Sequence, residues 1–264
     1  VCAVEALKQF VCTYLIAADA LVIKDLTSKY LQLLRTDPNV AAKRGSALAL
    51  SALPNEFLIP DWLNILKTLC AACLLPENPD DRDAETRVNA VRGLATVCET
   101  LTCSSKDSRV FDASSEESLL LVIKNDVLEC LFTALNDYSV DNRGDVGSWV
   151  REAAVEALER CTYILCRRLT IVDGNGIKTL PTYTVDEGSI SSSHEGNPFF
   201  DANLAGRLIG GIAKQAVEKI DKVRDIAGRT LQRILCNKNT FVPFIPHRHK
   251  LEAIVPSDAS FNWA

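Results

Sequence analysis

The sequence predicts an all-α protein in which helix pairs stack side by side into a solenoid. Two observations lead to this fold class. Apolar residues recur at intervals of three and four in nearly every segment, whereas the alternating pattern of strands is rare. In addition, a polar turn followed by Arg and then, three residues later, by Ala returns four times along the chain. Because a single helix pair cannot bury its own apolar face, repeated pairs are expected to stack.

The repeated motif places an acidic residue six or seven positions before the Arg of each second helix. The four acid and Arg combinations are Asp37 with Arg44, Asp81 with Arg87, Asp145 with Arg151, and Glu218 with Arg224. The motif resembles the HEAT repeat, in which Asp and Arg of successive repeats form a hydrogen-bonded ladder, so the solenoid is expected to be HEAT- or armadillo-like. A partly exposed ion pair contributes about 1 kcal/mol or less. Burial of the Leu and Val rows must therefore supply most of the stability.

The remaining segments complete one continuous solenoid domain. We expect helical repeats over residues 1–168, a flexible insertion over 169–200 that is rich in Gly, Ser, Asp and Pro, and a terminal helix pair with an extended Pro-rich tail over 201–264. The first helices of the pairs are expected at 26–34, 60–73, 119–135 and 202–216, with an exposed loop at 103–117. Two prolines within 241–246 exclude a helix there. The bulky apolar side chains of that segment either dock on the last helix pair or contact another protein.

Composition narrows the classes of function. The net charge of −5 and the pI near 5.4 give no general excess of positive charge that would attract nucleic acid. The sequence contains no apolar run of the ~20 residues that a membrane-spanning helix needs, and no signal peptide opens it. We therefore expect a cytoplasmic location and no membrane insertion. The chain starts with Val inside a helical pattern, which we expect of a segment of a longer protein.

The chemistry-bearing residues do not form a recognisable active site. The ten Cys are spread mainly through apolar helical stretches and are expected to be reduced core thiols. Cys70 and Cys73 have CxxC spacing, which leaves a zinc or redox site as an alternative, although no second CxxC or paired His accompanies them. No nucleophile elbow, zinc-binding helix motif or phosphate loop is present. We expect no catalytic residues, no bound metal and no small-molecule cofactor.

The segment 141–154, Asp-Asn-Arg-Gly-Asp-Val-Gly-Ser-Trp-Val-Arg-Glu-Ala-Ala, joins a glycine-containing turn to an amphipathic helix. Glycine permits a sharp bend, and Asp145 is placed to accept backbone N–H groups at the helix start. The apolar face expected on this helix consists of Trp149, Val150, Ala153, Ala154 and Leu158.

Four blocks of sequence, in this order, resemble the C-terminal half of the tubulin-folding cofactor D family. They are Asp80–Ala90, Arg143–Arg151, Lys214–Arg224 and Val242–Arg248. The resemblance implies a non-catalytic protein that binds β-tubulin and forms an assembly with cofactor E carrying α-tubulin. Cofactor C then joins, tubulin hydrolyses its GTP, and the α/β-tubulin heterodimer is released. The resemblance also implies binding of an Arf-like small GTPase and adds microtubule association to the cytoplasmic location. A generic α-solenoid adaptor for another protein is the alternative.

Six residues are candidates for the protein-binding surface: Arg143, Asp145, Trp149, Phe244, His247 and Arg248. Each also has a purely structural interpretation. Trp149 suits a core position, Asp145 with Arg151 suits a cap and a ladder pair, and Phe244 suits docking on its own domain. Any stimulation of GTP hydrolysis belongs to the assembled complex, and the sequence alone does not assign a catalytic role to Arg143.

Overall fold

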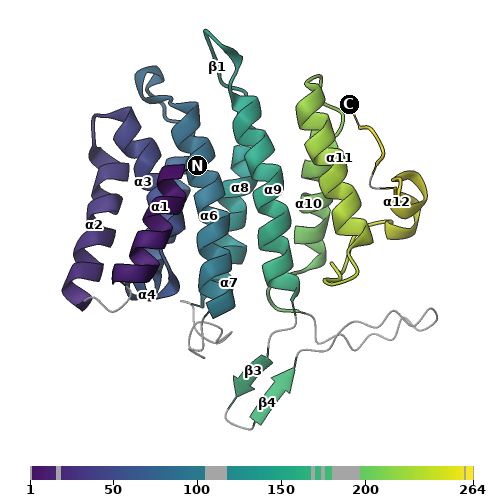
Figure 1. The fold of residues 1–264 in the computed structure, drawn as a ribbon. Coiled ribbons are helices and arrows are strands. Elements are labelled where there is room, and N and C mark those ends of the chain that lie inside the picture. Colours follow the sequence, from purple (N-terminus) through teal and green to yellow (C-terminus); the bar gives the residue numbers. More distant parts are fainter. Residues whose placement is uncertain are drawn as a thin grey trace. The chain divides into compact units, whose positions relative to one another are not determined.

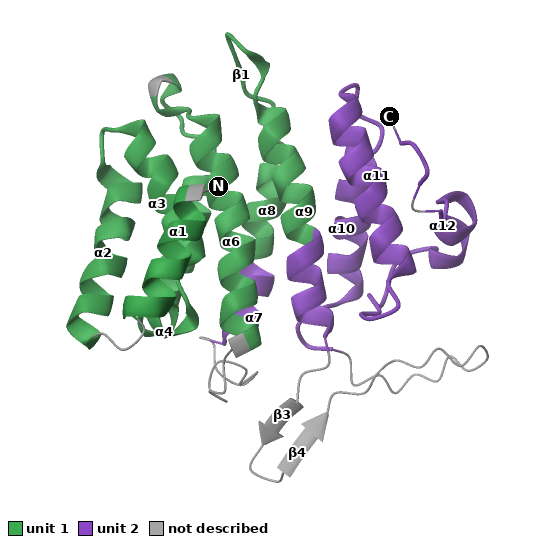
Figure 2. Cartoon of the chain, viewed as in Figure 1, with its two compact units in different colours: residues 1–105, 126–158 green, residues 106–125, 159–264 purple. Residues whose placement is uncertain are grey.

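The structure, a computed structural model, describes residues 2–15, 19–104, 118–167, 170–173, 176–179, 197–258 and 260–263. Helices dominate this part of the chain (Figure 1), and the only strands in it are short. The predicted all-α fold of stacked helix pairs is therefore confirmed. The chain divides into two compact units (Figure 2): unit 1 comprises residues 1–105 and 126–158, and unit 2 comprises 106–125 and 159–264.

Unit 1 contains the helix pairs nearer the N-terminus. Its elements are α1 (Cys2–Phe10), the π-helix η1 (Val11–Leu15), α2 (Ala20–Thr36), α3 (Val40–Ala52), α4 (Asn55–Leu58), η2 (Ile59–Asp61), α5 (Trp62–Cys73), η3 (Pro79–Asp81), α6 (Ala84–Ser104), α8 (Leu128–Ala134), β1 (Val140–Asp141), β2 (Gly144–Asp145) and the first part of α9 (Gly147–Cys166). Helices α2 and α3 form one pair, and α5 and α6 form the next. Helix α3 packs against α6, while α2 packs against α5 and α5 against α8. First helices and second helices thus form separate rows, as in a HEAT repeat.

Small residues allow the second helices of unit 1 to approach closely. A Cβ added to Gly93 on α6 would lie 3.0 Å from the backbone oxygen of Ala47 on α3. Leu50, Leu69 and Leu94 fill the surrounding space and are fully buried. Because helix propensity alone gives little stability to isolated helices, this shared apolar burial holds the pairs together.

Unit 2 contains the last helix pair. Its elements are α7 (Leu119–Val122), the start of the π-helix η5 (Ile123–Val127), the end of α9, the antiparallel strands β3 (Thr170–Asp173) and β4 (Gly176–Thr179), α10 (Ala202–Gln215), α11 (Asp221–Cys236) and α12 (Arg248–Ile254). Helix α10 packs against α11, and α11 against α12. Ion pairs connect further elements of the unit: Arg233 on α11 binds Glu159 on α9 at 2.6 Å, and Lys124 binds Asp201, the N-cap of α10, at 2.8 Å.

Two predicted segments differ in detail from the structure. Within the predicted insertion 169–200, the described residues include strands β3 and β4, and Phe199 and Phe200 are completely buried, so the core of unit 2 resumes before residue 201. The rest of that insertion, including His194, and the predicted loop residues 105–117 lie outside the described residues. The Pro-rich tail is not extended throughout, because it turns at Phe244 and His247 and then forms α12.

Candidate functional site

A ladder of buried and half-buried arginines connects successive repeats of unit 1. Its first rung starts from Arg44 on α3. The Nε atom of Arg44 donates to Asp83 Oδ2 at 2.8 Å, and its Nη2 donates to Asp83 Oδ1 at 2.5 Å. Asp83 precedes α6 and also accepts from the backbone N–H of Thr86 at 2.8 Å, so it caps α6 while it binds the preceding repeat. Arg44 also pairs with Glu85 in the first turn of α6.

The second rung is the most deeply buried. Arg87 on α6 donates from Nε to Asp137 Oδ2 at 2.8 Å and from Nη2 to Ser139 Oγ at 2.7 Å. Only 2% of the Arg87 side chain and 4% of the Asp137 side chain is exposed. A charge at such a position requires its partner, because an uncompensated charge in the interior is strongly unfavourable.

The third rung lies within one repeat. Arg151 on α9 donates to Asp145 Oδ2 at 3.1 Å and to the backbone oxygen of Asp137 at 2.6 Å. Its guanidinium also lies over the ring of Tyr138, 4.1 Å from the centroid. Asp145 accepts the backbone N–H of Ser148 at 2.9 Å, which makes it a cap as well as an ion-pair partner.

The other acid and Arg combinations expected from the sequence are not side-chain pairs. Asp37 accepts the backbone N–H of Asn39, and Asp81 accepts from the side-chain amide of Asn78. Arg224 reaches the backbone oxygen of Glu218 at 2.8 Å, and its carboxylate partner is Asp221. The expected pairs do not form because Arg44 and Arg87 each reach into the next repeat. Their partners, Asp83 and Asp137, lie in the turns before the second helices α6 and α9, and not in the turn before the helix that carries the Arg.

The sequence interpretation therefore missed the carboxylates that carry the ladder, Asp83 and Asp137, together with Glu85. A signal for Asp83 was available, because Asp directly before a helical stretch is a preferred N-cap. Asp137 had no comparable signal. It follows α8 in the sequence, and only the packing of one repeat on the next places it against Arg87.

Residues 138–147, called the hairpin below, contain the paired strands β1 and β2 and adjoin this ladder. Strand β1 pairs with β2 in an antiparallel register, and Gly144 has a φ of 104°, a left-handed conformation that suits glycine. Gly147 is needed for a different reason. A Cβ at this position would lie 2.3 Å from the backbone oxygen of Asp137, and the Gly147 N–H donates to Ser139 at 2.9 Å.

Arg143 forms two ion pairs and a contact with an aromatic ring. It pairs with Glu85 at 2.9 Å and with Asp141 at 2.7 Å, and its guanidinium lies 5.0 Å from the ring centroid of Trp149. The hydrogen bonds that Arg143 donates to Asp141, first from its side chain and then from its backbone N–H, lower the pKa of Asp141 below its ordinary value. Next to this network the side chains of Tyr138 and Val140 are exposed, Val140 by 72%. Trp149 is half-buried, at the margin of the buried face that Val150, Ala153, Ala154 and Leu158 form.

The candidate residues of the tail belong to unit 2, whereas those of the hairpin belong to unit 1. Arg248 donates to the backbone oxygen of Val242 at 2.6 Å and to that of Leu235 at 3.2 Å, and it lies over the ring of Phe241. These contacts make Arg248 an internal support of the tail. Phe244 and His247 both have positive φ and are exposed at the surface.

The described residues bear on the metal and thiol sites that the sequence left open. Among them, no cluster of His, Cys, Asp or Glu is arranged to hold a metal ion. Cys130 donates to the backbone oxygen of Cys70 at 3.3 Å, so this part of the predicted CxxC alternative belongs to the contact between α5 and α8. None of the helices described here has both the length and the apolar character needed to cross a bilayer.

The paired helices and the inter-repeat Arg ladder define a helical-repeat protein of the HEAT type, a class that binds other proteins through extended surfaces. Residues 206–264 match the family described as "Tubulin folding cofactor D C terminal". The chain is also 29% identical over 255 residues to Tubulin-specific chaperone D of Dictyostelium discoideum. Both matches confirm the resemblance to the C-terminal region of the tubulin-folding cofactor D family.

The alignment covers very different shares of this chain and of the Dictyostelium relative. The alignment with the Dictyostelium relative covers 92% of this chain but only 16% of the relative's length. The chain therefore corresponds to a small part of that protein. No solved structure matches the chain.

Proposed function

We propose that this chain is a non-catalytic binding segment of a tubulin-folding cofactor and that it contacts β-tubulin. The observation that carries the proposal is the hairpin of unit 1, which presents the exposed side chains of Tyr138 and Val140 beside Arg143 and Trp149. Exposed aromatic and Arg side chains are typical of protein interfaces. The family resemblance supplies the identity of the partner.

The rigidity of the hairpin supports a binding role. Arg151 stacks beneath Tyr138, and Arg143 is fixed by Glu85 and Asp141. Side chains that are already ordered lose little conformational entropy when a partner binds, which favours affinity. The Nε and Nη2 atoms of Arg143 donate to Asp141, and its Nη1 donates to Glu85. Arg143 therefore acts in this proposal as a positioned contact and not as a catalytic group.

We further propose that the cofactor acts in the cytoplasm as part of a tubulin-folding assembly and that it associates with microtubules. The segment would help to hold β-tubulin while cofactor E delivers α-tubulin and cofactor C joins. An Arf-like small GTPase would bind the cofactor as a further partner. GTP hydrolysis by tubulin would drive release if the cofactor prefers one nucleotide state, because a binder shifts an equilibrium only through such a preference. The alternative, a generic scaffold for another protein, requires the same fold but no affinity for β-tubulin.

A pull-down with purified β-tubulin tests the proposal, and two Val→Asp variants provide a matched comparison. Val140→Asp places a charge on the hairpin surface, whereas Val217→Asp makes the same change at a residue of unit 2 that is 80% exposed. We expect Val140→Asp to weaken β-tubulin binding about tenfold, as the loss of an interface anchor does, and Val217→Asp to leave it unchanged. Equal binding by the unchanged chain and Val140→Asp would remove the hairpin from the interface, and no binding by the unchanged chain would favour the generic scaffold.

A further inference from the structure

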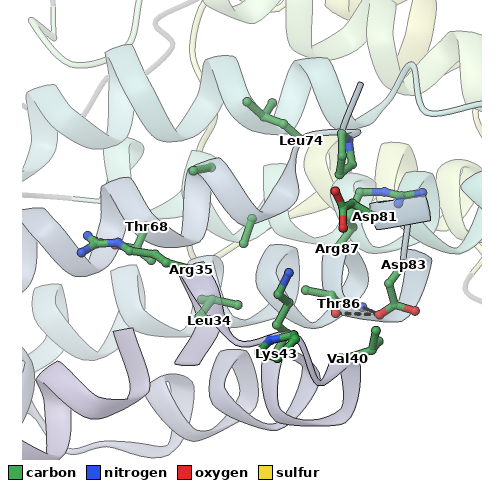
Figure 3. Close-up of a pocket in the computed structure, with 14 residues that line it drawn as sticks. Leu34, Arg35, Val40, Lys43, Thr68, Leu74, Asp81, Asp83, Thr86 and Arg87 are labelled. Atoms are coloured by element: carbon green, nitrogen blue, oxygen red, sulfur yellow. Dashed lines mark hydrogen bonds between the residues drawn. The ribbon is translucent and has the colours of Figure 1, made fainter. Parts of the chain in front are cut away.

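A groove in unit 1 lies at the junction of the first two helix pairs. It has a volume of about 560 Å³ and is lined by the ends of α2 and α5, the starts of α3 and α6, and the turn containing Asp81 (Figure 3). Its size is that of a pocket that accepts a short peptide segment or a small ligand. Every residue that lines it belongs to unit 1.

The groove contains two cations that have no carboxylate partner among the described residues. Arg35 donates only to the neutral side chains of Asn64 and Thr68. The ammonium group of Lys43 has no hydrogen bond or ion pair to any described residue, and Figure 3 shows the Lys43 side chain between Arg35 at one end and Asp83 at the other. Arg guanidinium and Lys ammonium groups with spare donors are the usual recognition groups for carboxylates.

The acidic residues of the groove lie at the end opposite Arg35 (Figure 3). Asp83 is neutralised by Arg44, and Arg87 by Asp137, so neither pair contributes a free charge. Asp81 lies near Arg87 at the end opposite Arg35 (Figure 3) and accepts only from an amide. The free charge of the groove is therefore positive around Arg35 and Lys43 and negative at Asp81.

Apolar side chains also line the groove. Val40 is 40% exposed and Leu74 is 45% exposed, and both contribute to the groove together with Pro38 and Pro76. Large apolar side chains exposed in a concave site favour an occupant that carries its own apolar groups. A small inorganic anion would leave this apolar surface in water.

From this arrangement we propose that the groove binds an acidic peptide segment in which carboxylates alternate with apolar side chains. The carboxylates contact Arg35 and Lys43, and the apolar side chains cover Val40 and Leu74. Asp81 fixes the direction of the segment by repelling acidic residues at its own end. The proposal stands on the groove alone and holds for any partner that supplies such a segment.

Fluorescence anisotropy with a labelled peptide that alternates Glu with Phe tests the proposal, using the whole 264-residue chain. The double variant Arg35→Glu/Lys43→Glu should bind about tenfold more weakly, because it replaces two attractions by two repulsions. The matched control Lys24→Glu/Lys29→Glu makes a comparable change of charge at exposed positions of α2 outside the groove and should bind like the unchanged chain. Asp81→Asn should bind the peptide more tightly, an outcome that loss of folding cannot produce.

Several results would overturn the acidic-peptide site. These are no binding by the unchanged chain, equal loss in both double variants, equal binding of a peptide that alternates Lys with Phe, or no gain from Asp81→Asn. Equal binding of a peptide that alternates Glu with Gly would exclude the apolar part of the proposal. Far-UV circular dichroism of each variant establishes that the helices are intact.

Discussion

The buried rung between Arg87 and Asp137 allows the role of the ladder to be measured. Asp137→Asn removes a negative charge while keeping the shape of the side chain. Because the Arg87 and Asp137 side chains are only 2% and 4% exposed, the guanidinium would remain buried without its counter-charge. Breaking one partner of such a pair costs about 3–5 kcal/mol.

Asp141→Asn provides the matched comparison. The Asp141 side chain is 34% exposed and pairs with Arg143, whose side chain is 40% exposed. Water and salt screen an exposed pair, so it contributes much less to stability than a buried pair. The same chemical change should therefore cost several times less at Asp141 than at Asp137, although both carboxylates lie within the same turn region of unit 1.

The assay is urea-induced unfolding followed by far-UV circular dichroism, with hydrogen exchange used to assign the transition to unit 1. With a denaturant slope of about 2 kcal/mol per M urea, a loss of 3 kcal/mol lowers the midpoint by about 1.5 M. Asp141→Asn should lower the midpoint by a much smaller amount. Equal midpoint shifts in the two variants, or a shift below about 0.5 M for Asp137→Asn, would refute the idea that burial makes the Arg87–Asp137 pair important for the stability of unit 1.

Three further predictions follow from the same packing. Gly147→Ala should lower the free energy of unfolding of unit 1 by about 1–3 kcal/mol or more, measured by urea unfolding, because its Cβ would lie 2.3 Å from the Asp137 oxygen; an unchanged midpoint would contradict it. Gly228→Ala should displace Trp263, which would lie 2.2 Å from the new Cβ. Limited proteolysis should then remove the C-terminal segment faster, and an unchanged cleavage rate would exclude that contact. Burial alone would raise the pKa of Asp83, but hydrogen bonds from Arg44 and Thr86 lower it below its ordinary value. The ionised carboxylate therefore stabilises the fold above the unfolded pKa of about 3.9, and this contribution is lost as the pH falls through the lower, folded pKa. Asp83→Asn should make unfolding less sensitive to pH below about 4, which acid titration followed by circular dichroism measures; an unchanged acid transition would contradict the assignment.

The helices themselves could be predicted from the sequence because their signals are local. Apolar spacing predicts a buried face of α9 at Trp149, Val150, Ala153, Ala154 and Leu158; the last four are buried and Trp149 is half-buried. The cap at Asp145 follows from the preference of an Asp for the exposed N–H groups of a helix start. Such features depend on residues within one or two turns of each other, so no knowledge of the neighbouring repeat is needed.

The ion-pair partners could not be predicted in this way. The sequence pattern joins Arg44 to Asp37 and Arg87 to Asp81, whereas the structure joins them to Asp83 and Asp137. The separation of 50 residues between Arg87 and Asp137 is closed only when the repeats pack on each other. The groove of Arg35 and Lys43 likewise exists only after α2, α3, α5 and α6 have been brought together.

For this protein, sequence alone determined the all-α repeat, the positions of most helices and the resemblance to a tubulin-folding family, because periodicity and local motifs record which side of each helix is buried. Tertiary structure alone decided which arginine meets which carboxylate, that Gly147 leaves room for the Asp137 turn, and which cations find no carboxylate among the residues that the structure describes. These features depend on distances between repeats, and such distances are set by how the buried side chains of one helix fit against the next.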